Sequence, residues 1–344
     1  MTAESLPMPG NVSPQLIFDT LNAFQRSAAL KTAIELDLFT AIAQGRDNAK
    51  SLAAACGAAE RGVRILADYL VVIGLLTKSH DRWSLTPESA LFLDRRSPAY
   101  LGGAVEFMGS DEHRRHFDDL TAAVRRGGAS DDEQSVLAPD HEAWVRFARG
   151  MAGLMTTPAE ALAQRVVGQN ASAMKVLDIA AGHGLFGIAV ARHNPQATVV
   201  AVDWPNVLAV AVENAQQAGV CDRYQTLPGS AFDVDFGGGY DVVLLTNFLH
   251  HFDRSAIDKV MRKVYAALKP GGRAFALEFV PHDDRVTPPT SAAFALVMLG
   301  TTPAGDAYTF AEYREMFAAA GFSRCECSDL EPTVQQLVVA HRKA

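Results

Sequence analysis

The sequence has few cysteines, no excess of positive charge and no long apolar run, and each absence excludes a class of protein. Its four cysteines lack paired CxxC spacing, which argues against a disulfide framework or a structural zinc site and favours a reducing, cytoplasmic environment. With 31 Lys and Arg against 39 Asp and Glu, the net charge of −8 gives no general attraction to nucleic acid or to an anionic membrane. No uncharged run approaches the ~20 residues that span a bilayer, and the first residues lack the pattern of an export signal. We therefore expect a soluble chain of two domains that acts on small molecules.

Residues 14–93 carry apolar side chains at three- and four-residue spacing, which predicts helices. Ser51 is a candidate helix start and Gly57 a candidate helix stop. The following segment, LLTKSHDRWSLTP, predicts two short strands about a polar turn. Helices followed by a small β-ribbon predict a winged helix-turn-helix domain over residues 1–95.

The winged-helix domain lacks the charge that DNA binding needs. Residues 51–80 contain only three Lys or Arg side chains, and the candidate recognition helix carries Val71, Val72 and Ile73 in a row. Neutralising phosphates takes several clustered cations, so packing against a protein partner is favoured over a DNA-binding regulator.

Residues 99–167 predict a second set of helices, interrupted by the exposed loop RRGGASDDEQ, and we assign residues 96–170 as a helical linker and acceptor-pocket region. From Met174 onward short β-branched runs alternate with helical segments, which predicts a mostly parallel sheet covered on both faces in a domain spanning 171–344. The last two strand-like segments, SRCECSDL and VQQLVVAHR, have no helix between them and predict an antiparallel hairpin at one edge.

A glycine-rich segment, DIAAGHGLFG from Asp178 to Gly187, follows a predicted strand and opens a helix. Its glycines satisfy GxGxxG, so a nicotinamide-dependent oxidoreductase is one interpretation, with Asp203 at the end of the next strand as the ribose-binding acid. We expect Asp178 to face the ligand, where a carboxylate would repel a pyrophosphate. S-adenosylmethionine has no phosphate and carries an ammonium and a sulfonium, so the charge favours this methyl donor.

The segments LDIAAGHG, LLTNFLHHFD and ALKPGGR, together with Asp203, resemble the class I methyltransferases. With the helical front domain, the chain resembles over nearly its whole length the small-molecule O-methyltransferases typified by plant caffeate and acetylserotonin methyltransferases and by bacterial antibiotic-biosynthesis homologues. The resemblance implies a Rossmann-like α/β domain with a seven-stranded, mostly parallel sheet that ends in an antiparallel strand. It also implies that the front domain pairs two chains into a homodimer.

The resemblance also implies which residues bind S-adenosylmethionine. Relatives carry a Gly-Asp pair near the adenine, whereas this chain has Gly229-Ser230, so Ser230 replaces the expected acid. Trp204 and Phe232 are expected along the adenine, with plain core packing as the alternative. The expected donor-binding residues are Asp178, Gly182, Gly184, Asp203, Trp204, Ser230, Phe232 and Asn247.

His250 follows a predicted strand at the carboxyl end of the sheet, where open α/β folds bind their ligands. A neutral imidazole can accept the proton of a phenol as its oxygen attacks the methyl group, and by resemblance His250 is the general base. His251 and Asp253 make a metal site an alternative, but we expect adjacent side chains to diverge, so no metal is predicted.

Two acids are expected to support the base. Glu278 matches the acid that orients the histidine in the family. Relatives then carry Gly-x-Glu-Arg-Thr, where this chain has Gly305-Asp306-Ala307-Tyr308-Thr309. Ala307 therefore replaces the second acid, and Asp306 is the candidate substitute.

The acceptor is expected to be a hydroxylated aromatic or polyketide-like small molecule, since relatives build the acceptor cavity from helices flanking the catalytic domain. Methylation of carbon or nitrogen, or a non-methylating relative, are the alternatives. Core packing is also an alternative role for the candidate pocket residues, which are Phe107, Met108, Phe147, Met151, Met155, Phe294 and Met298.

Overall fold

The computed structural model describes residues 12–130, 142–168 and 172–344. The chain divides into two compact units, Met1–Gly109 and Ser110–Ala344. The region 96–170, expected as a linker, is shared between them, because its first helix belongs to the first unit and the remaining helices to the second. None of the helices in these described ranges is long and apolar enough to cross a membrane.

The first unit is helical with one small hairpin, as the apolar spacing predicts. Leu76 pairs with Leu85 in the antiparallel hairpin, and the buried residues of the unit gather around Leu38, Leu52 and Leu70. Its elements are α1 (Gln15–Leu21), α2 (Ala23–Glu35), α3 (Leu38–Ala43), α4 (Ala49–Cys56), α5 (Glu60–Val72), β1 (Leu76–Ser79), β2 (Arg82–Leu85), α6 (Pro87–Phe92) and α7 (Gly102–Met108).

Helix α4 shows how local sequence sets an element's ends. The side chain of Asn48 accepts a hydrogen bond from the Ser51 amide at 3.0 Å and forms a capping box, so the helix begins at Ala49 and not at Ser51. The predicted stop at Gly57 is confirmed, because its φ of 61° lies in the left-handed region that glycine adopts without strain.

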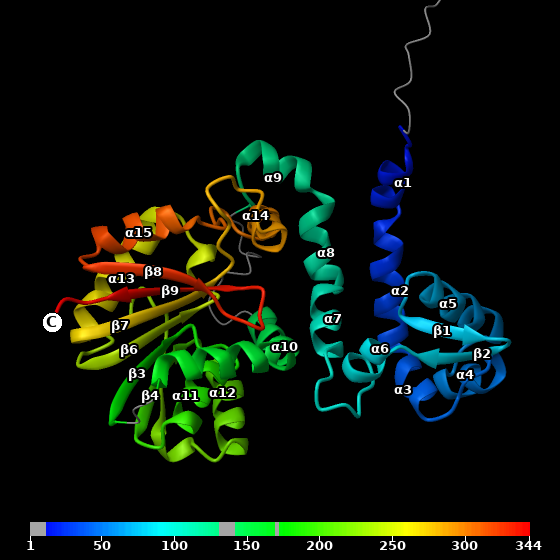
Figure 1. Ribbon diagram of the computed structural model, residues 1–344, viewed down its shortest axis with the longest axis horizontal. Helices are drawn as coiled ribbons and strands as arrows, with labels where there is room; N and C mark the ends of the chain where they lie inside the picture. Colours follow the sequence, from blue (N-terminus) through cyan, green and yellow to red (C-terminus); the bar gives the residue numbers. More distant parts are fainter. Residues whose placement is uncertain (1–11, 131–141, 169–171) are drawn as a thin grey trace, which may run out of the picture. The chain divides into compact units, whose positions relative to one another are not determined.

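The second unit is built on a seven-stranded sheet of order β5-β4-β3-β6-β7-β9-β8 (Figure 1). The first five of these strands run parallel, whereas β9 pairs antiparallel with both β7 and β8, so the predicted terminal hairpin is confirmed. The strands are β3 (Met174–Ile179), β4 (Ala197–Asp203), β5 (Tyr224–Pro228), β6 (Tyr240–Thr246), β7 (Leu268–Glu278), β8 (Arg324–Asp329) and β9 (Gln336–His341).

Helices cover both faces of this sheet, with α10, α11 and α12 on one side and α13 and α15 on the other (Figure 1). Because the central strands are buried on both faces, β6 is apolar along nearly all of its length. The helices are α8 (Asp111–Asp118), α9 (Leu120–Arg126), α10 (Glu142–Val167), α11 (Leu185–His193), α12 (Pro205–Gln217), α13 (Arg254–Ala267), α14 (Pro289–Thr301) and α15 (Phe310–Ala319), with short 3-10 turns at Cys221–Arg223 and Leu249–His251.

Helix α9 continues through Arg126, so the loop expected at 125–134 begins two residues later than predicted, at Gly127, which has a φ of 89°. Residues 131–134 of that prediction lie outside the described residues. The chain winds outward from β3 through β4 to β5 and then returns to β6, on the other side of β3. The carboxyl ends of β3 and β6 therefore flank the switch point at which doubly wound sheets bind ligands.

Candidate active site

A cavity of about 250 Å³ lies at this switch point, within the second unit. It is lined by the carboxyl ends of four parallel strands and the segments that follow them, which contribute Ala180, Asp203, Gly229 and Thr246 among others. The helices α10, α11 and α12 and the segment after β6 complete its walls with Trp144, Phe147, Met155, Phe186, Val207, Phe248, His251 and Phe252.

The glycine loop holds the floor of the cavity in a conformation that side chains disfavour. Gly182 and Gly184 have φ angles of 57° and 75°. A Cβ on Gly184 would lie 2.7 Å from the Tyr224 hydroxyl, and one on Gly187 would lie 2.8 Å from the Asp178 carboxylate. The three glycines therefore let α11 start close against the sheet, and of the three only Gly182 lines the cavity.

We expected Asp178 to face the ligand, but its side chain points away from the cavity. Its side chain is fully buried beneath the loop, does not line the cavity, and accepts the Gly187 amide at 3.0 Å through Oδ2. Its other oxygen, Oδ1, has no hydrogen-bond partner among the described residues, and burial raises the pKa of this carboxyl to about 7. Asp178 therefore stabilises the glycine loop. Because the loop lies between its carboxyl group and the cavity, Asp178 could attract a bound cation only from beneath the loop.

Asp203 is the acid that lines the cavity. Its Oδ2 accepts the Gly182 amide at 2.8 Å and its Oδ1 accepts the Trp204 amide at 2.7 Å. Burial raises its pKa to about 6 although both amides oppose that shift. Each carboxylate oxygen has a second lone pair, so one further donor can bind to each.

The two rings expected along the adenine, Trp204 and Phe232, both line the cavity and also pack against buried neighbours. Trp204 lines the cavity and packs on the buried cluster of Ala148, Val207 and Val210. Phe232 lines the cavity and lies edge-on to Phe252 at 4.9 Å between ring centroids. Both side chains therefore have packing contacts as well as a position on the cavity wall.

Ser230 and Asn247 also line the cavity. The Ser230 hydroxyl accepts the Phe232 amide at 3.1 Å, so it stabilises a turn of its own loop. Asn247 has a φ of 53°, which non-glycine residues rarely adopt, and its side chain accepts a hydrogen bond from Gln335.

The structure brings His250 and Glu278 together at the strand ends. The Nδ1 of His250 bonds to Oε2 of Glu278, and both side chains are buried. Oε1 of Glu278 accepts the amides of Phe248 and Leu249 at 3.2 and 2.9 Å. One carboxylate therefore orients the imidazole and also holds the loop that carries it.

The expectation that the side chains of His250 and His251 diverge is wrong. The 3-10 turn places the His250 and His251 rings 4.3 Å apart, and His251 rather than His250 lines the cavity. Its Nδ1 contacts the Phe248 carbonyl at 3.2 Å, and burial lowers its pKa well below 6.5, with His250 adding to the effect. His251 is therefore a neutral imidazole on the cavity wall.

The third residue of the metal alternative has another role, because Asp253 caps α13 by accepting the Ala256 amide at 2.7 Å. Across the described ranges, no group of three His, Cys, Asp or Glu side chains is arranged to hold a metal ion.

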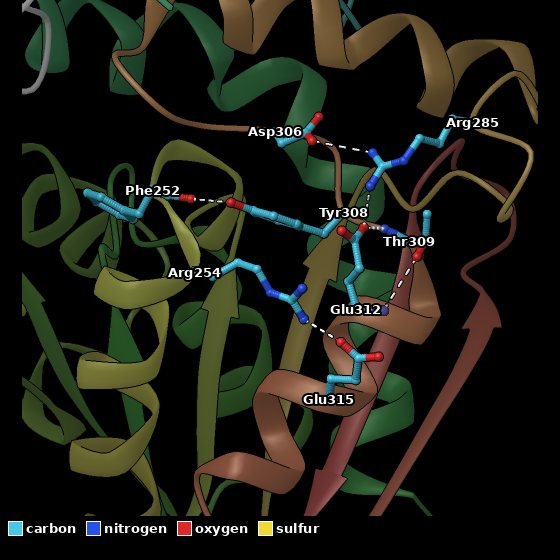
Figure 2. Close-up of polar contacts among 8 residues, drawn as sticks. All are labelled: Phe252, Arg254, Arg285, Asp306, Tyr308, Thr309, Glu312 and Glu315. Atoms are coloured by element: carbon cyan, nitrogen blue, oxygen red, sulfur yellow. Dashed lines mark hydrogen bonds and ion pairs between the residues drawn. The ribbon is translucent and has the colours of Figure 1, made fainter. Parts of the chain in front are cut away.

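The carboxylate of Asp306 pairs with Arg285 at 3.3 Å and not with His250, and Figure 2 shows this ion pair. The Asp306 backbone amide donates to the His250 carbonyl at 3.0 Å. Ala307, which stands where relatives carry the second acid, is fully buried. Asp306 therefore contacts the histidine segment through its backbone.

Sequence reasoning missed His183 and Trp144 as cavity residues. Burial lowers the pKa of His183 to about 4, and its Nδ1 accepts the Leu185 amide at 3.2 Å, so Nε2 carries the proton and is a donor. Its position inside the GxG motif was the available signal. No such signal marked Trp144 in the sequence, because a helical pattern does not show which face of α10 lies against the cavity.

The candidate acceptor residues separate into groups. Phe147 and Met155 line the cavity, whereas Met151 and Met298 are core residues. Phe294 lies edge-on to the His250 ring, 4.8 Å between centroids. Phe107 lies in α7 and Met108 ends it, so both belong to the first unit.

The cavity fits S-adenosylmethionine better than a dinucleotide. Among the described residues that line it there is one carboxylate, Asp203, and no lysine or arginine to balance a pyrophosphate. A second carboxylate, Asp178, lies beneath the loop. The fold and this site together define a class I methyltransferase that uses S-adenosylmethionine.

Comparisons with known proteins place the chain more narrowly. The family described as an O-methyltransferase domain matches residues 121–323, and an O-methyltransferase dimerisation domain matches residues 18–95. The chain belongs to this O-methyltransferase family, and S-adenosylmethionine is its methyl donor. The nicotinamide-dependent oxidoreductase is thereby set aside.

Three similar proteins illustrate the match. The 3-hydroxy-5-methyl-1-naphthoate 3-O-methyltransferase of Streptomyces sahachiroi is 30% identical over 92% of this chain and 91% of its own length. A protein of Nostoc punctiforme PCC 73102, proposed to be an O-methyltransferase, has a crystal structure with 52% identity and a TM-score of 0.92, covering 97% of this chain and 100% of that one. Human N-acetylserotonin methyltransferase in complex with SAM shares the fold, with a TM-score of 0.82 at 21% identity, covering 98% of this chain and 100% of that one.

Proposed function

We propose that this enzyme methylates a hydroxyl group of an aromatic or polyketide-like small molecule, with His250 as the general base. The observation that carries the proposal is the buried bond between His250 Nδ1 and Glu278. Because a carboxylate only accepts, Nδ1 carries the proton and Nε2 of the neutral imidazole keeps its lone pair. That nitrogen can take a proton from the acceptor.

Each residue then has a defined task. S-adenosylmethionine supplies a methyl group on a positively charged sulfur. Asp203 binds the ribose hydroxyls with its two remaining lone pairs, and the Trp204 and Phe232 rings pack along the adenine. His250 removes the acceptor's proton, and Glu278 stabilises the imidazolium that forms.

Aromatic side chains around the histidine support an aromatic acceptor. Phe279 and Phe294 stack with centroids 4.2 Å apart, and the Phe294 ring lies edge-on to His250. The Streptomyces relative is named for a reaction on a hydroxynaphthoate. An aromatic hydroxyl compound would extend this cluster of rings.

The test is a screen of hydroxylated aromatics and polyketide-like phenols with the purified enzyme and S-adenosylmethionine. We expect mass spectrometry to show the gain of one methyl group, and fragmentation to place it on oxygen. A product methylated on carbon or nitrogen would contradict the proposal.

We propose further that the chain forms a homodimer through its first unit. Helices α1 and α2 expose apolar side chains that a monomer would leave in water, and this region matches the dimerisation domain. These side chains are Leu16, Ile17, Phe18, Leu21 and Phe24. Sedimentation of the full chain at micromolar concentration should give twice the mass of one chain, and a stable monomer would overturn this assignment.

A further inference from the structure

The catalytic segment Phe248–Asp253, which we call the histidine loop, is held from outside by the segment Gly305–Thr309. The Asp306 amide donates to the His250 carbonyl at 3.0 Å. The Tyr308 hydroxyl donates to the Phe252 carbonyl at 2.7 Å, as Figure 2 shows. These two bonds reach the loop on both sides of His251.

The contact between the two segments is close. A Cβ added to Gly305 would lie 2.3 Å from the His250 carbonyl oxygen, nearer than such atoms can approach. The backbones therefore touch, and a shift of one segment moves the other.

Ion pairs connect the segment Gly305–Thr309 to α15 (Figure 2). Arg285 bridges the carboxylates of Asp306 and Glu312 at 3.3 and 2.7 Å. Glu312 in turn forms a capping box with Thr309, which starts the helix. Arg254, just after the histidine loop, pairs with Glu315 on the same helix.

We propose that Tyr308 is a positioning residue, which sets the place of the His250 imidazole by holding the backbone of the histidine loop. Glu278 is the side-chain hydrogen-bond partner of that imidazole. Ala307 offers no side-chain hydrogen bond to the imidazole. Its neighbours Asp306 and Tyr308 bind the carbonyl groups of the histidine loop. This inference rests on the proposed role of His250 as the base.

The Tyr308 hydroxyl is suited to a permanent bond. The side chain is 5% exposed, and burial raises its pKa to about 12, so the hydroxyl remains a donor at any working pH. Its chemistry is therefore limited to donating one hydrogen bond to the Phe252 carbonyl.

Tyr308→Phe removes that hydrogen bond and keeps the ring. Because small misplacements of a catalytic group cost large factors in rate, we expect kcat to fall by about tenfold. The KM for S-adenosylmethionine should change less than kcat, because Tyr308 itself does not line the donor cavity and acts on its wall only through the backbone of Phe252.

Tyr240→Phe is the matched control. The Tyr240 hydroxyl is buried and donates to the Phe236 carbonyl at 2.9 Å, at the start of β6 and outside the histidine loop. Both variants lose one tyrosine-to-carbonyl hydrogen bond, and Tyr240→Phe should retain the parent kcat. If both variants lose rate together in proportion to a lowered melting temperature, Tyr308 is only structural and the inference is wrong.

A spectroscopic readout tests the positioning itself. The Nδ1 proton of His250 should give a far-downfield NMR signal in the parent that shifts or broadens in Tyr308→Phe but not in Tyr240→Phe. An unchanged signal with unchanged kcat in Tyr308→Phe would overturn the inference while leaving the base assignment intact. Full activity in His250→Ala would instead overturn the proposed function.

Discussion

The imidazole of His250 and the carboxylate of Glu278 share a hydrogen bond in the protein interior, where Glu278 is fully buried and His250 is 4% exposed. The second oxygen of Glu278 binds two backbone amides of the histidine loop. This arrangement fixes the protonated nitrogen of the ring as Nδ1, and it therefore predicts how each partner responds to substitution.

His250→Ala should lower turnover by about 10² to 10⁴, the usual contribution of a positioned proton acceptor. The affinity for S-adenosylmethionine should remain within a few-fold, because His250 does not line the donor cavity. Steady-state kinetics with a true acceptor and calorimetry with the donor measure the two effects separately. A variant that keeps most of its turnover would show that the acceptor needs no base.

Glu278→Gln should also lower turnover strongly, although the substitution is nearly isosteric. A glutamine amide group facing Nδ1 favours the tautomer with its proton on Nε2, which removes the lone pair that would accept from the substrate. The measurement is kcat together with the nitrogen chemical shifts of His250. Parent-like kcat with the proton still on Nδ1 would show that the carboxylate charge is dispensable.

Asp203→Asn should weaken donor binding at least tenfold. The carboxylate accepts the Gly182 and Trp204 amides, and an asparagine can satisfy only one of them while presenting a donor to the other. Calorimetry should show a similar loss for S-adenosylmethionine and for its demethylated product, because both carry the ribose. Unchanged binding of either ligand would remove Asp203 from the donor site.

Lys263→Met should loosen the wall of the donor cavity. The Lys263 ammonium binds the carbonyls of Ala231, Phe232 and Val234 at 2.8, 2.7 and 2.9 Å, and two of these residues line the cavity. We expect a several-fold weaker donor affinity, on the order of one to two lost hydrogen bonds. Lys259→Met, an exposed position on the same helix, is the control and should bind like the parent. Equal affinities for the two variants would count against this role.

Asp178→Asn should change how stability depends on pH. The carboxyl has a pKa of about 7 in the folded chain against 3.8 as the ordinary value, so between these values the folded state binds the proton more tightly. Stability from this group is therefore present at low pH and is lost as pH rises toward about 7, at up to about 1.4 kcal/mol per pH unit.

Denaturant unfolding of the donor-free enzyme at about pH 5 and about pH 8 measures this difference. The parent should lose roughly 3 kcal/mol more than Asp178→Asn over that interval. Parallel pH dependence in the two proteins would mean that Asp178 is ionised throughout.

Local patterns in the sequence determined much of the fold. Apolar spacing marks the helices that pack on the sheet through their buried faces, as in α13, where Ile257, Val260, Met261 and Val264 are buried. β-branched runs mark the strands, and glycine positions mark the donor loop. The place of His250 after β6 also followed from the sequence, because the carboxyl ends of parallel strands gather at one edge of the sheet.

The contacts of the site were decided only by tertiary structure. Asp178 turned beneath the loop because Gly187 lets α11 approach β3, and the two histidine rings came together because the segment after β6 forms a 3-10 turn. Asp306 paired with Arg285, a residue 21 positions away along the chain, and left the histidine segment only its backbone amide. Local sequence sets the conformation of a segment through neighbouring residues, whereas the direction of a polar side chain depends on which distant partner offsets its loss of water, and that partner is set by the packing of the whole unit.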